Sequence, residues 1–398
     1  MLSNISLLLD IGTTTISGAI LNKPKKRLLA SDSILNGQAG IADDVISRID
    51  FALKNSINAT QLQKLVASSI NSLISRLVAQ SGKEIKDIDS AYCVSNTAMH
   101  HLFLGIDPSP LVTPPYKAAQ KAEMRVYAER VSLKLRKGTP VTFLPNIGSF
   151  IGSDALSVIL ASEIYKSSSA KLAIDIGTNG EVMLGNKDKI LVASTAAGPA
   201  FEGRHISCGM MAKEGAIESI KLRKNRIEFK VIGKSAPKGL SGSGLIDAAA
   251  VMLKCGAMDK SGKMDNAEFV IYKRGKSKIS MKQADIRKIQ LAKGAVYAAI
   301  KVLLRRYNIS EPGIGRIYIT GSFGNTIDVN SLMEIGLIPR VDKRKVSFLK
   351  KGALQGLYLY VVNPGVHKNL LSILSKIRHI PLLGRGFSED FTSSLFMG

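Results

Sequence analysis

The chain contains two copies of one short turn pattern, Asp10-Ile11-Gly12-Thr13-Thr14-Thr15 and Asp175-Ile176-Gly177-Thr178-Asn179-Gly180. Each copy follows a short apolar run and precedes a second run with strand-like composition, so each predicts a turn that closes a β-hairpin. A Walker loop or a Rossmann turn would instead lead from a strand into a helix and would carry more glycines. The repeated pattern therefore predicts a fold with two similar hairpins in separate parts of the chain.

The residue types in these turns indicate phosphate chemistry. In a tight turn Gly12 and Gly177 can adopt a positive φ, so that successive backbone N–H groups converge on an anion, and threonine hydroxyls add donors. An aspartate beside phosphate would repel it unless a divalent cation lay between, and Mg²⁺ takes one or two carboxylates together with phosphate oxygens. We therefore predict Asp10 and Asp175 as metal-side residues. The predicted phosphate-binding residues are Gly12, Thr13, Thr14, Gly177, Thr178 and Asn179.

The length of 398 residues exceeds the usual size of one core and predicts two lobes, residues 1–165 and residues 166–398, the second with a C-terminal helical segment. No apolar stretch reaches the roughly 18 residues that a membrane span needs. The apolar first 20 residues lack the basic region and cleavage site of a signal peptide. We expect a cytoplasmic protein that does not contact a membrane.

Cysteine and histidine spacing argues against metal sites built from these residues. Cys93, Cys208 and Cys255 are far apart in sequence and cannot supply four ligands to an iron–sulfur cluster. Cys93 and Cys255 are expected to be buried, inert thiols. His100 and His101 are adjacent, so on a helix they lack the i,i+4 spacing of a ligand pair. We expect one of the two to be packed and the other to be polar.

The formal net charge is +24, and the basic residues gather at 221–238 and 340–351. Such a charge steers acidic partners or polyanions toward a protein at low salt. No aromatic-interleaved basic stripe or DNA-reading motif accompanies it, which argues against a nucleic-acid partner. An acidic protein partner and a solvated surface without specific meaning remain the two alternatives.

Asp154 follows Gly152 and Ser153 and precedes an amphipathic helix predicted over residues 155–165, which would join the lobes. One interpretation is structural, with Asp154 as the N-cap of this helix. The other is catalytic, because an acid at this point could orient water or a hydroxyl for in-line attack on a γ-phosphate.

Two further glycine turns lie in the second half of the chain. Residues 239–244 precede a helix predicted over residues 245–254 and stopped by Gly256, and residues 320–325 follow a predicted strand. Small residues at such turns let a flat ring or a ribose lie against the backbone, although glycine before a helix often only makes a turn. The predicted adenosine contacts are Gly242, Ser243, Gly244, Gly321, Ser322 and Gly324.

The two strand–Asp-x-Gly–strand units, the acid at the connecting helix and the late glycine turns together resemble the acetate kinase, sugar kinase, actin-like chaperone and actin superfamily. Longer motifs look like the ATPase domain of the reductive activators of corrinoid proteins. They are residues 175–181, 197–203, 209–210, 215–217, 242–247 and 324–325, with 96–101, 104–108 and 291–295. The resemblance implies an α/β fold with two ribonuclease-H-like lobes of mixed sheet flanked by helices and a nucleotide cleft between them.

The same resemblance implies an ATP-hydrolysing enzyme, with ATP and Mg²⁺ as cofactors, that helps return an inactive Co(II) corrinoid protein to Co(I) for methyl transfer. Asp10, Asp154 and Asp175 would then be the catalytic residues. Glu202 matches a family motif, where a catalytic role and a role in holding backbone amides are both open. Because Met1 stands close to the first predicted strand, whereas family members carry an iron–sulfur domain, we expect no iron–sulfur cluster in this chain and a separate ferredoxin-like reductant.

Two other functions of the same superfamily stay open. One is a small-molecule kinase with Asp154 as the general base. The other is a nucleotide sensor or scaffold that does not hydrolyse ATP. The sequence does not indicate the oligomeric state.

Overall fold

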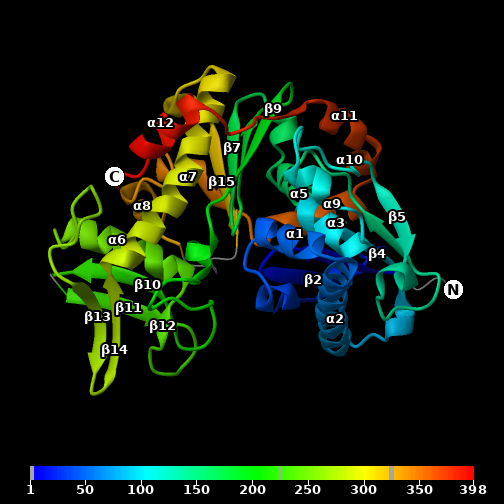
Figure 1. Cartoon of the computed structure of the whole chain (residues 1–398), viewed down its shortest axis with the longest axis horizontal. Helices are drawn as coiled ribbons and strands as arrows, with labels where there is room; N and C mark the ends of the chain where they lie inside the picture. The colour runs from blue at the N-terminus through cyan, green and yellow to red at the C-terminus, as the bar shows by residue number, and fades with distance from the viewer. Residues whose placement is uncertain (1–3, 225, 322–326) are drawn as a thin grey trace. The chain divides into compact units, whose positions relative to one another are not determined.

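The structure, a computed structural model, describes residues 4–224, 226–321 and 327–398. The chain forms two compact units (Figure 1). Unit 1 comprises residues 1–166, 188–190 and 351–379, and unit 2 comprises residues 167–187, 191–350 and 380–398. Residues 351–379, expected in the second lobe, pack with unit 1.

Unit 1 is built on a mixed sheet of six strands in the order β3-β2-β1-β4-β6-β5. β1 and β4 are parallel, as are β4 and β6, and the other neighbours are antiparallel. Both faces of β1 are covered, and of its residues only Asp10 is partly exposed. The strands are β1 (Ile5–Ile11), β2 (Thr15–Asn22), β3 (Arg27–Leu35), β4 (Ile88–Ser95), β5 (Met124–Tyr127) and β6 (Pro140–Phe143).

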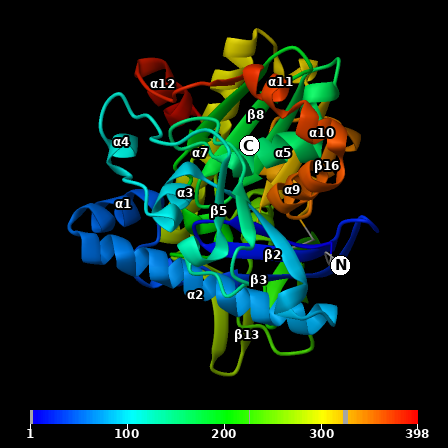
Figure 2. The ribbon, with the colours of Figure 1, turned by 90° about the vertical axis from the view of Figure 1, so that its right-hand side faces the viewer.

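The long helix α2 (Ser56–Ser81) lies along β2 and β3 (Figure 2). Asn55 caps its start through a hydrogen bond to the Asn58 N–H, and Gly82 ends it in the left-handed conformation. The periodicity of residues 62–77 predicts this helix, and the prediction is confirmed. Other helices of the N-terminal part of unit 1 are α1 (Val45–Leu53), α3 (Thr97–Leu104), α4 (Ser109–Val112) and α5 (Ser153–Ser162).

The segment that enters unit 1 late in the chain contains α9 (Gly352–Val362), α10 (Pro364–Lys368), α11 (Leu370–Ser375) and β17 (Ile377–His379). α9 packs against α5 and against β1, β2 and β4. Its approach to α5 is close, because a Cβ atom on Gly356 would lie 1.8 Å from the carbonyl oxygen of Ser157. α9 therefore completes the hydrophobic core of a sheet whose strands all precede residue 144.

Unit 2 contains a second mixed sheet, in which β16, β15, β7, β8 and β9 are neighbours in this order. β7 is parallel to β15 and antiparallel to β8, so a β-hairpin again lies next to a parallel pair. The strands are β7 (Lys171–Ile176), β8 (Gly180–Gly185), β9 (Ile190–Thr195), β15 (Arg316–Gly321) and β16 (Val346–Phe348), and the helices are α6 (Gly242–Lys254), α7 (Gln283–Tyr307), α8 (Val329–Glu334) and α12 (Arg385–Ser393).

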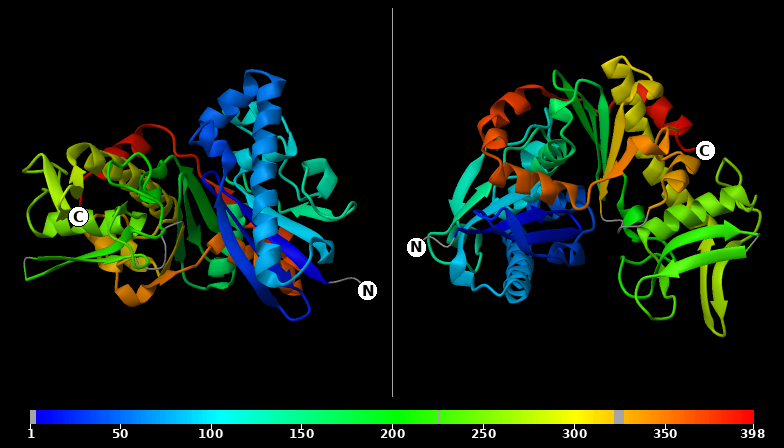
Figure 3. Two further views of the ribbon diagram at one scale, coloured as in Figure 1. Left: turned by 90° about the horizontal axis from the view of Figure 1, so that it is seen from below. Right: turned by 180° about the vertical axis from the view of Figure 1, so that it is seen from behind.

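Two small sheets extend unit 2 (Figure 3). One joins β10 (Ala216–Arg223), β11 (Arg226–Val231) and β12 (Gly239–Leu240), and the other is the hairpin of β13 (Glu268–Arg274) and β14 (Ser277–Lys282). Phe229 and Tyr272 connect them through an edge-to-face contact with ring centroids 5.8 Å apart. The predicted fold class, α/β with mixed sheets flanked by helices, is confirmed.

Two details of the helices bear on the predictions. The helix expected over residues 155–165 begins and ends earlier, at Ser153 and Ser162. Gly256 follows α6 with a φ of +73°, as expected for the residue beyond a helix C-terminus. None of the described helices combines the length and the apolar character that crossing a bilayer requires.

Candidate functional site

The first turn closes the hairpin of β1 and β2, as predicted. Asp10 lies opposite Ser17 in this hairpin and beside Val94 of the parallel strand β4. The expected positive φ is wrong for Gly12 and for Gly177. Gly12 is required for another reason, because a Cβ atom there would lie 2.6 Å from the carbonyl oxygen of Thr15, which accepts the Gly12 N–H at 3.1 Å. The turn is thus tight enough to exclude any side chain at this position.

Two asparagines form hydrogen bonds with this turn, one with the Thr13 hydroxyl and one with the backbone. Asn96 directly follows β4, and its side-chain amide donates to the hydroxyl oxygen of buried Thr13 at 2.9 Å. Because the amide donates, the hydroxyl proton of Thr13 can be given to another acceptor, such as a phosphate oxygen. Asn36 follows β3, donates from its side chain to the Gly12 carbonyl at 3.0 Å, and donates its backbone N–H to the Thr14 carbonyl.

Neither asparagine is among the predicted site residues. For Asn96 the signal was present, because it opens a motif shared with the corrinoid activators and stands at the carboxyl end of a strand. Asn36 lies outside any motif and could not have been found from one sequence.

Asp154 lies in the first turn of α5, but it is not the N-cap. Gly152 occupies that position, and Asp154 accepts the Ala155 N–H at 2.7 Å from inside the helix. Gly152 lies against the end of β4, where a Cβ atom would be 2.0 Å from the Ser95 carbonyl oxygen. Burial raises the pKa of Asp154 to about 6, against hydrogen bonds from the backbone that lower it. A carboxyl group with this pKa can exchange a proton near neutral pH.

The second turn closes the hairpin of β7 and β8, with Asp175 opposite Glu181 and Ile176 opposite Gly180. The parallel strand β15 places Thr320 beside Asp175 and Gly321 beside Ile176. Gly321, one of the predicted adenosine contacts, therefore lies next to the predicted phosphate turn. Ser322 and Gly324 lie outside the described residues.

Glu202 binds the second turn directly. It ends the short helix Pro199–Glu202, and its carboxylate accepts the Thr178 hydroxyl at 2.7 Å. The Gly198 N–H also donates to the Thr178 carbonyl at 2.9 Å. The two turns therefore differ. The Thr178 hydroxyl already gives its proton to Glu202, so in this structure it does not have a proton to donate to phosphate, the role predicted for both threonines.

Gly242, Ser243 and Gly244 form the first turn of α6 and are buried. A Cβ atom on Gly244 would lie 2.2 Å from the carbonyl oxygen of Ile217 in β10, and the Ser243 hydroxyl donates to the Glu218 carbonyl at 2.7 Å. These small residues let the helix approach β10 closely. Their contact with adenosine stays a prediction.

Two expectations about single residues are wrong. His100 and His101 are both buried, and burial lowers the pKa of His101 and brings that of His100 to about 3. Cys255 is exposed because it follows the last turn of α6, whereas Cys93 in β4 is buried as expected and its pKa is raised by that burial.

The residues fit a magnesium-bound nucleotide on the chemistry of their donors. No group of three or more His, Cys, Asp or Glu side chains that could hold a metal occurs among residues 4–224, 226–321 and 327–398. A Mg²⁺ ion bound with phosphate needs only one or two carboxylates, and each turn offers one aspartate. The tight Gly12 turn and the Thr13 hydroxyl suit a phosphate group beside them.

Comparison with protein families gives matches along nearly the whole chain. Residues 5–167 match the RACo middle region, and residues 169–398 match the C-terminal domain of RACo, the ASKHA domain. The order of the two matches is the order of the two turns along the sequence.

Individual relatives agree with these matches. The corrinoid activation enzyme RamQ of Eubacterium limosum is 34% identical over 379 residues, which are 89% of this chain and 63% of RamQ. The Co(II) methylated amine-specific corrinoid protein reductase of Methanosarcina barkeri is 25% identical over 374 residues, 85% of this chain and 67% of that protein.

A solved structure, titled reductive activator for corrinoid, iron–sulfur protein, superposes with a TM-score of 0.92 at 34% identity. The match covers 99% of this chain and 66% of the other. The chain thus spans about two thirds of the length of the relatives that it matches.

Proposed function

The chain belongs to the RACo family, with the RACo middle region followed by the ASKHA domain, and from this we propose that it is an ATP-hydrolysing activator of a corrinoid protein. In this proposal ATP turnover remodels a corrinoid protein so that its inactive Co(II) form can return to Co(I) for methyl transfer. The observation that carries the proposal is the pair of Asp-x-Gly-Thr hairpins in a chain whose relatives are named for corrinoid activation or reduction.

The proposed roles follow from the contacts of each side chain. Asp10 and Asp175 would bind Mg²⁺, which neutralises phosphate charge when bound. Thr13, whose oxygen is engaged by Asn96, would donate to phosphate. Thr178, whose proton goes to Glu202, would instead accept a hydrogen bond from a metal-bound water. Asp154, with a pKa near 6, would take a proton from the attacking water.

Electron transfer is the part of the activity that these residues do not supply. Three cysteines cannot complete a four-cysteine cluster, and Cys93 is buried in β4. We propose a ferredoxin-like iron–sulfur protein as the source of electrons and a corrinoid protein as the partner that is remodelled.

The test is steady-state hydrolysis of Mg-ATP by the purified chain, with and without a Co(II) corrinoid protein. We expect the corrinoid protein to stimulate turnover, and we expect Asp10→Asn to remove turnover and stimulation together. Asp50→Asn is the matched control, because it removes the same charge from an exposed position on α1. Absence of stimulation by several corrinoid proteins, with wild-type turnover in Asp10→Asn, would contradict the proposal.

The raised pKa of Asp154 also favours a second candidate, a kinase that phosphorylates a small molecule with Asp154 as its base. The same assay separates the two functions. ADP release that depends on a small molecule without any protein partner, and that falls in Asp154→Asn, would favour the kinase. Mg-ATP binding without turnover would indicate a nucleotide sensor.

A further inference from the structure

Lys351 stands where the chain passes from unit 2 into unit 1. It is the N-cap of α9 and has a φ of +49°, in the left-handed backbone region that residues other than glycine and asparagine rarely adopt. Lysine is not a usual N-cap residue, and its side chain makes no capping hydrogen bond to the helix. A lysine in this strained position indicates that its ammonium group has a function other than capping the helix.

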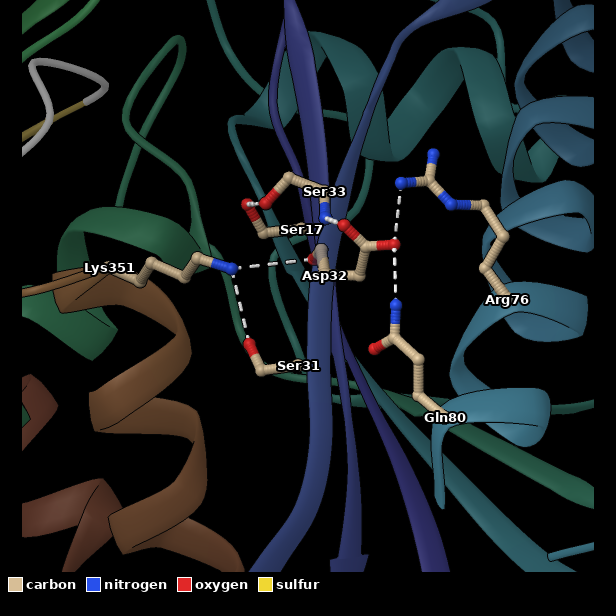
Figure 4. A network of polar contacts seen from close by, with 7 residues as sticks. All are labelled: Ser17, Ser31, Asp32, Ser33, Arg76, Gln80 and Lys351. Carbon is tan, nitrogen blue, oxygen red and sulfur yellow. Dashed lines mark hydrogen bonds and ion pairs between the residues drawn. The ribbon is translucent and has the colours of Figure 1, made fainter. Parts of the chain in front are cut away.

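The ammonium group rests on neutral oxygens. It donates to the Ser31 hydroxyl at 3.1 Å and to the backbone carbonyl of Asp32 at 3.4 Å. The carboxylate of Asp32 is engaged elsewhere, because it accepts from Arg76 at 2.7 Å and from Gln80 at 3.2 Å. Figure 4 shows Lys351 on one side of β3, with Arg76 and Gln80 on the other. The positive charge of Lys351 therefore has no ion pair with Asp32.

A row of polar side chains leads from this resting place to the first turn. Ser33 shares a face of β3 with Ser31, and its hydroxyl is 3.0 Å from that of Ser17 on β2. Ser17 lies opposite Asp10, and directly opposed residues of an antiparallel pair point to the same face. Lys351, the serines and Asp10 thus lie on one face of the unit 1 sheet.

Ser31, on which the ammonium group rests, lies one pleat from Ser33, about 7 Å along β3, and β2 lies between β3 and the strand of Asp10, with neighbouring strands about 5 Å apart. Asp10 is within electrostatic reach, since burial lowers the pKa of Lys351 while the charges of Asp32 and Asp10 act in the opposite direction. Lysine has a flexible side chain of four carbons and binds phosphate as a point charge, so it can turn from β3 toward a phosphate group that extends outward from the Asp10 turn.

We propose that Lys351 is a further phosphate-binding residue, whose ammonium group leaves Ser31 and the Asp32 carbonyl and binds a phosphate oxygen held at the Asp10 turn. This inference rests on the proposed nucleotide-dependent function. Lys351, the N-cap residue of α9, would then recognise nucleotide charge from the segment 351–379.

The test compares the affinity of the full chain for Mg-ATP and for adenosine, by calorimetry, in four variants. Lys351→Asn removes the charge and keeps a residue that accepts a φ of +49°, whereas Lys351→Arg keeps the charge. Lys351→Gly serves if the asparagine variant does not fold. Lys350→Asn is the matched control, because Lys350 is its exposed neighbour on the other side of the crossing.

We expect Lys351→Asn to weaken Mg-ATP binding on the order of tenfold, with a flatter dependence on salt and with no change for adenosine. Lys351→Arg should retain most of the affinity, and Lys350→Asn all of it. Unchanged Mg-ATP affinity in Lys351→Asn would overturn the inference while leaving the proposed function intact. Equal losses for Mg-ATP and adenosine would show a merely structural residue, and no binding of Mg-ATP by the wild-type chain would remove both proposals.

Discussion

Lys293 shows how a single buried charge can organise its surroundings. It lies on α7 with 1% of its surface exposed, and its ammonium group donates to the carbonyl of Phe396. Gln290, one turn earlier, donates to the neighbouring carbonyl of Leu395 at 2.8 Å. Two polar side chains of one helix thus bind the backbone of the last residues of the chain, and burial lowers the pKa of Lys293 from 10.5 to about 8.

This pKa predicts a dependence of stability on pH. Between about pH 8 and pH 10.5 the unfolded state binds a proton that the folded state has lost, so the free energy of unfolding rises with pH in this range. The desolvation of the charged amine below pH 8 costs about 3 kcal/mol. Chemical unfolding at pH 7.5 and pH 10 should therefore show the wild-type chain gaining about 2 kcal/mol relative to Lys293→Met. A constant difference between the two proteins would contradict the prediction.

Substitution by alanine should have opposite effects on stability at the two turn glycines, Gly12 and Gly177. Gly12→Ala would place a methyl group 2.6 Å from the Thr15 carbonyl oxygen, whereas in Gly177→Ala the nearest atom is 3.5 Å away. Neither residue has a positive φ. We expect Gly12→Ala to destabilise unit 1 by about 1–3 kcal/mol and Gly177→Ala to be neutral or to stabilise by up to about 1 kcal/mol. Thermal unfolding of both variants checks this, and equal shifts in Tm would show that the turns are alike.

Among the elements, α9 has the most exacting contact. The Cβ position of Gly356 is occupied by backbone of α5, 1.8 Å from the Ser157 carbonyl oxygen, so no side chain fits unless the helices separate. Such close approach is what a glycine inside a helix provides, at a cost in helix propensity.

Gly356→Ala should accordingly destabilise unit 1 by at least about 1–3 kcal/mol, seen as a fall of several degrees in Tm. Gly40→Ala is the matched control, since nothing lies within 4 Å of the Cβ position of Gly40 and its φ is not positive. If the two variants unfold at the same temperature, α9 does not depend on this contact.

At the scale of the whole molecule, local patterns predicted local structure well. The two hairpins, the α2 helix and the termination of α6 at Gly256 are each specified by neighbours in sequence, and each is confirmed. The exposure of Cys255 and the burial of both adjacent histidines depend on which elements pack together, which a single sequence does not indicate.

In the site, too, residues in local motifs were predicted, whereas contacts between residues distant in sequence were not. Asp10 and Asp175 stand in a repeated motif, and their roles remain predictions. The contacts that shape their turns, from Asn36, Asn96 and Glu202, join residues 24 to 83 positions apart. Only Asn96 and Glu202 lay in motifs that the sequence analysis singled out, because a hydrogen-bond partner that is distant in sequence leaves no periodicity to detect.

Residues 351–379 belong to unit 1 although most of unit 2 precedes them in the sequence, and this affects how unit 1 folds during synthesis on the ribosome. All strands of the six-stranded sheet are made by residue 143, but α9, which packs on one face of β1, β2 and β4, begins at residue 352. At a synthesis rate of about 5–20 residues per second, this face waits roughly 10–40 s for its cover. During that time the part of the sheet that α9 will cover stays exposed in the nascent chain, so chaperone capture and translation speed would affect the yield of folded protein.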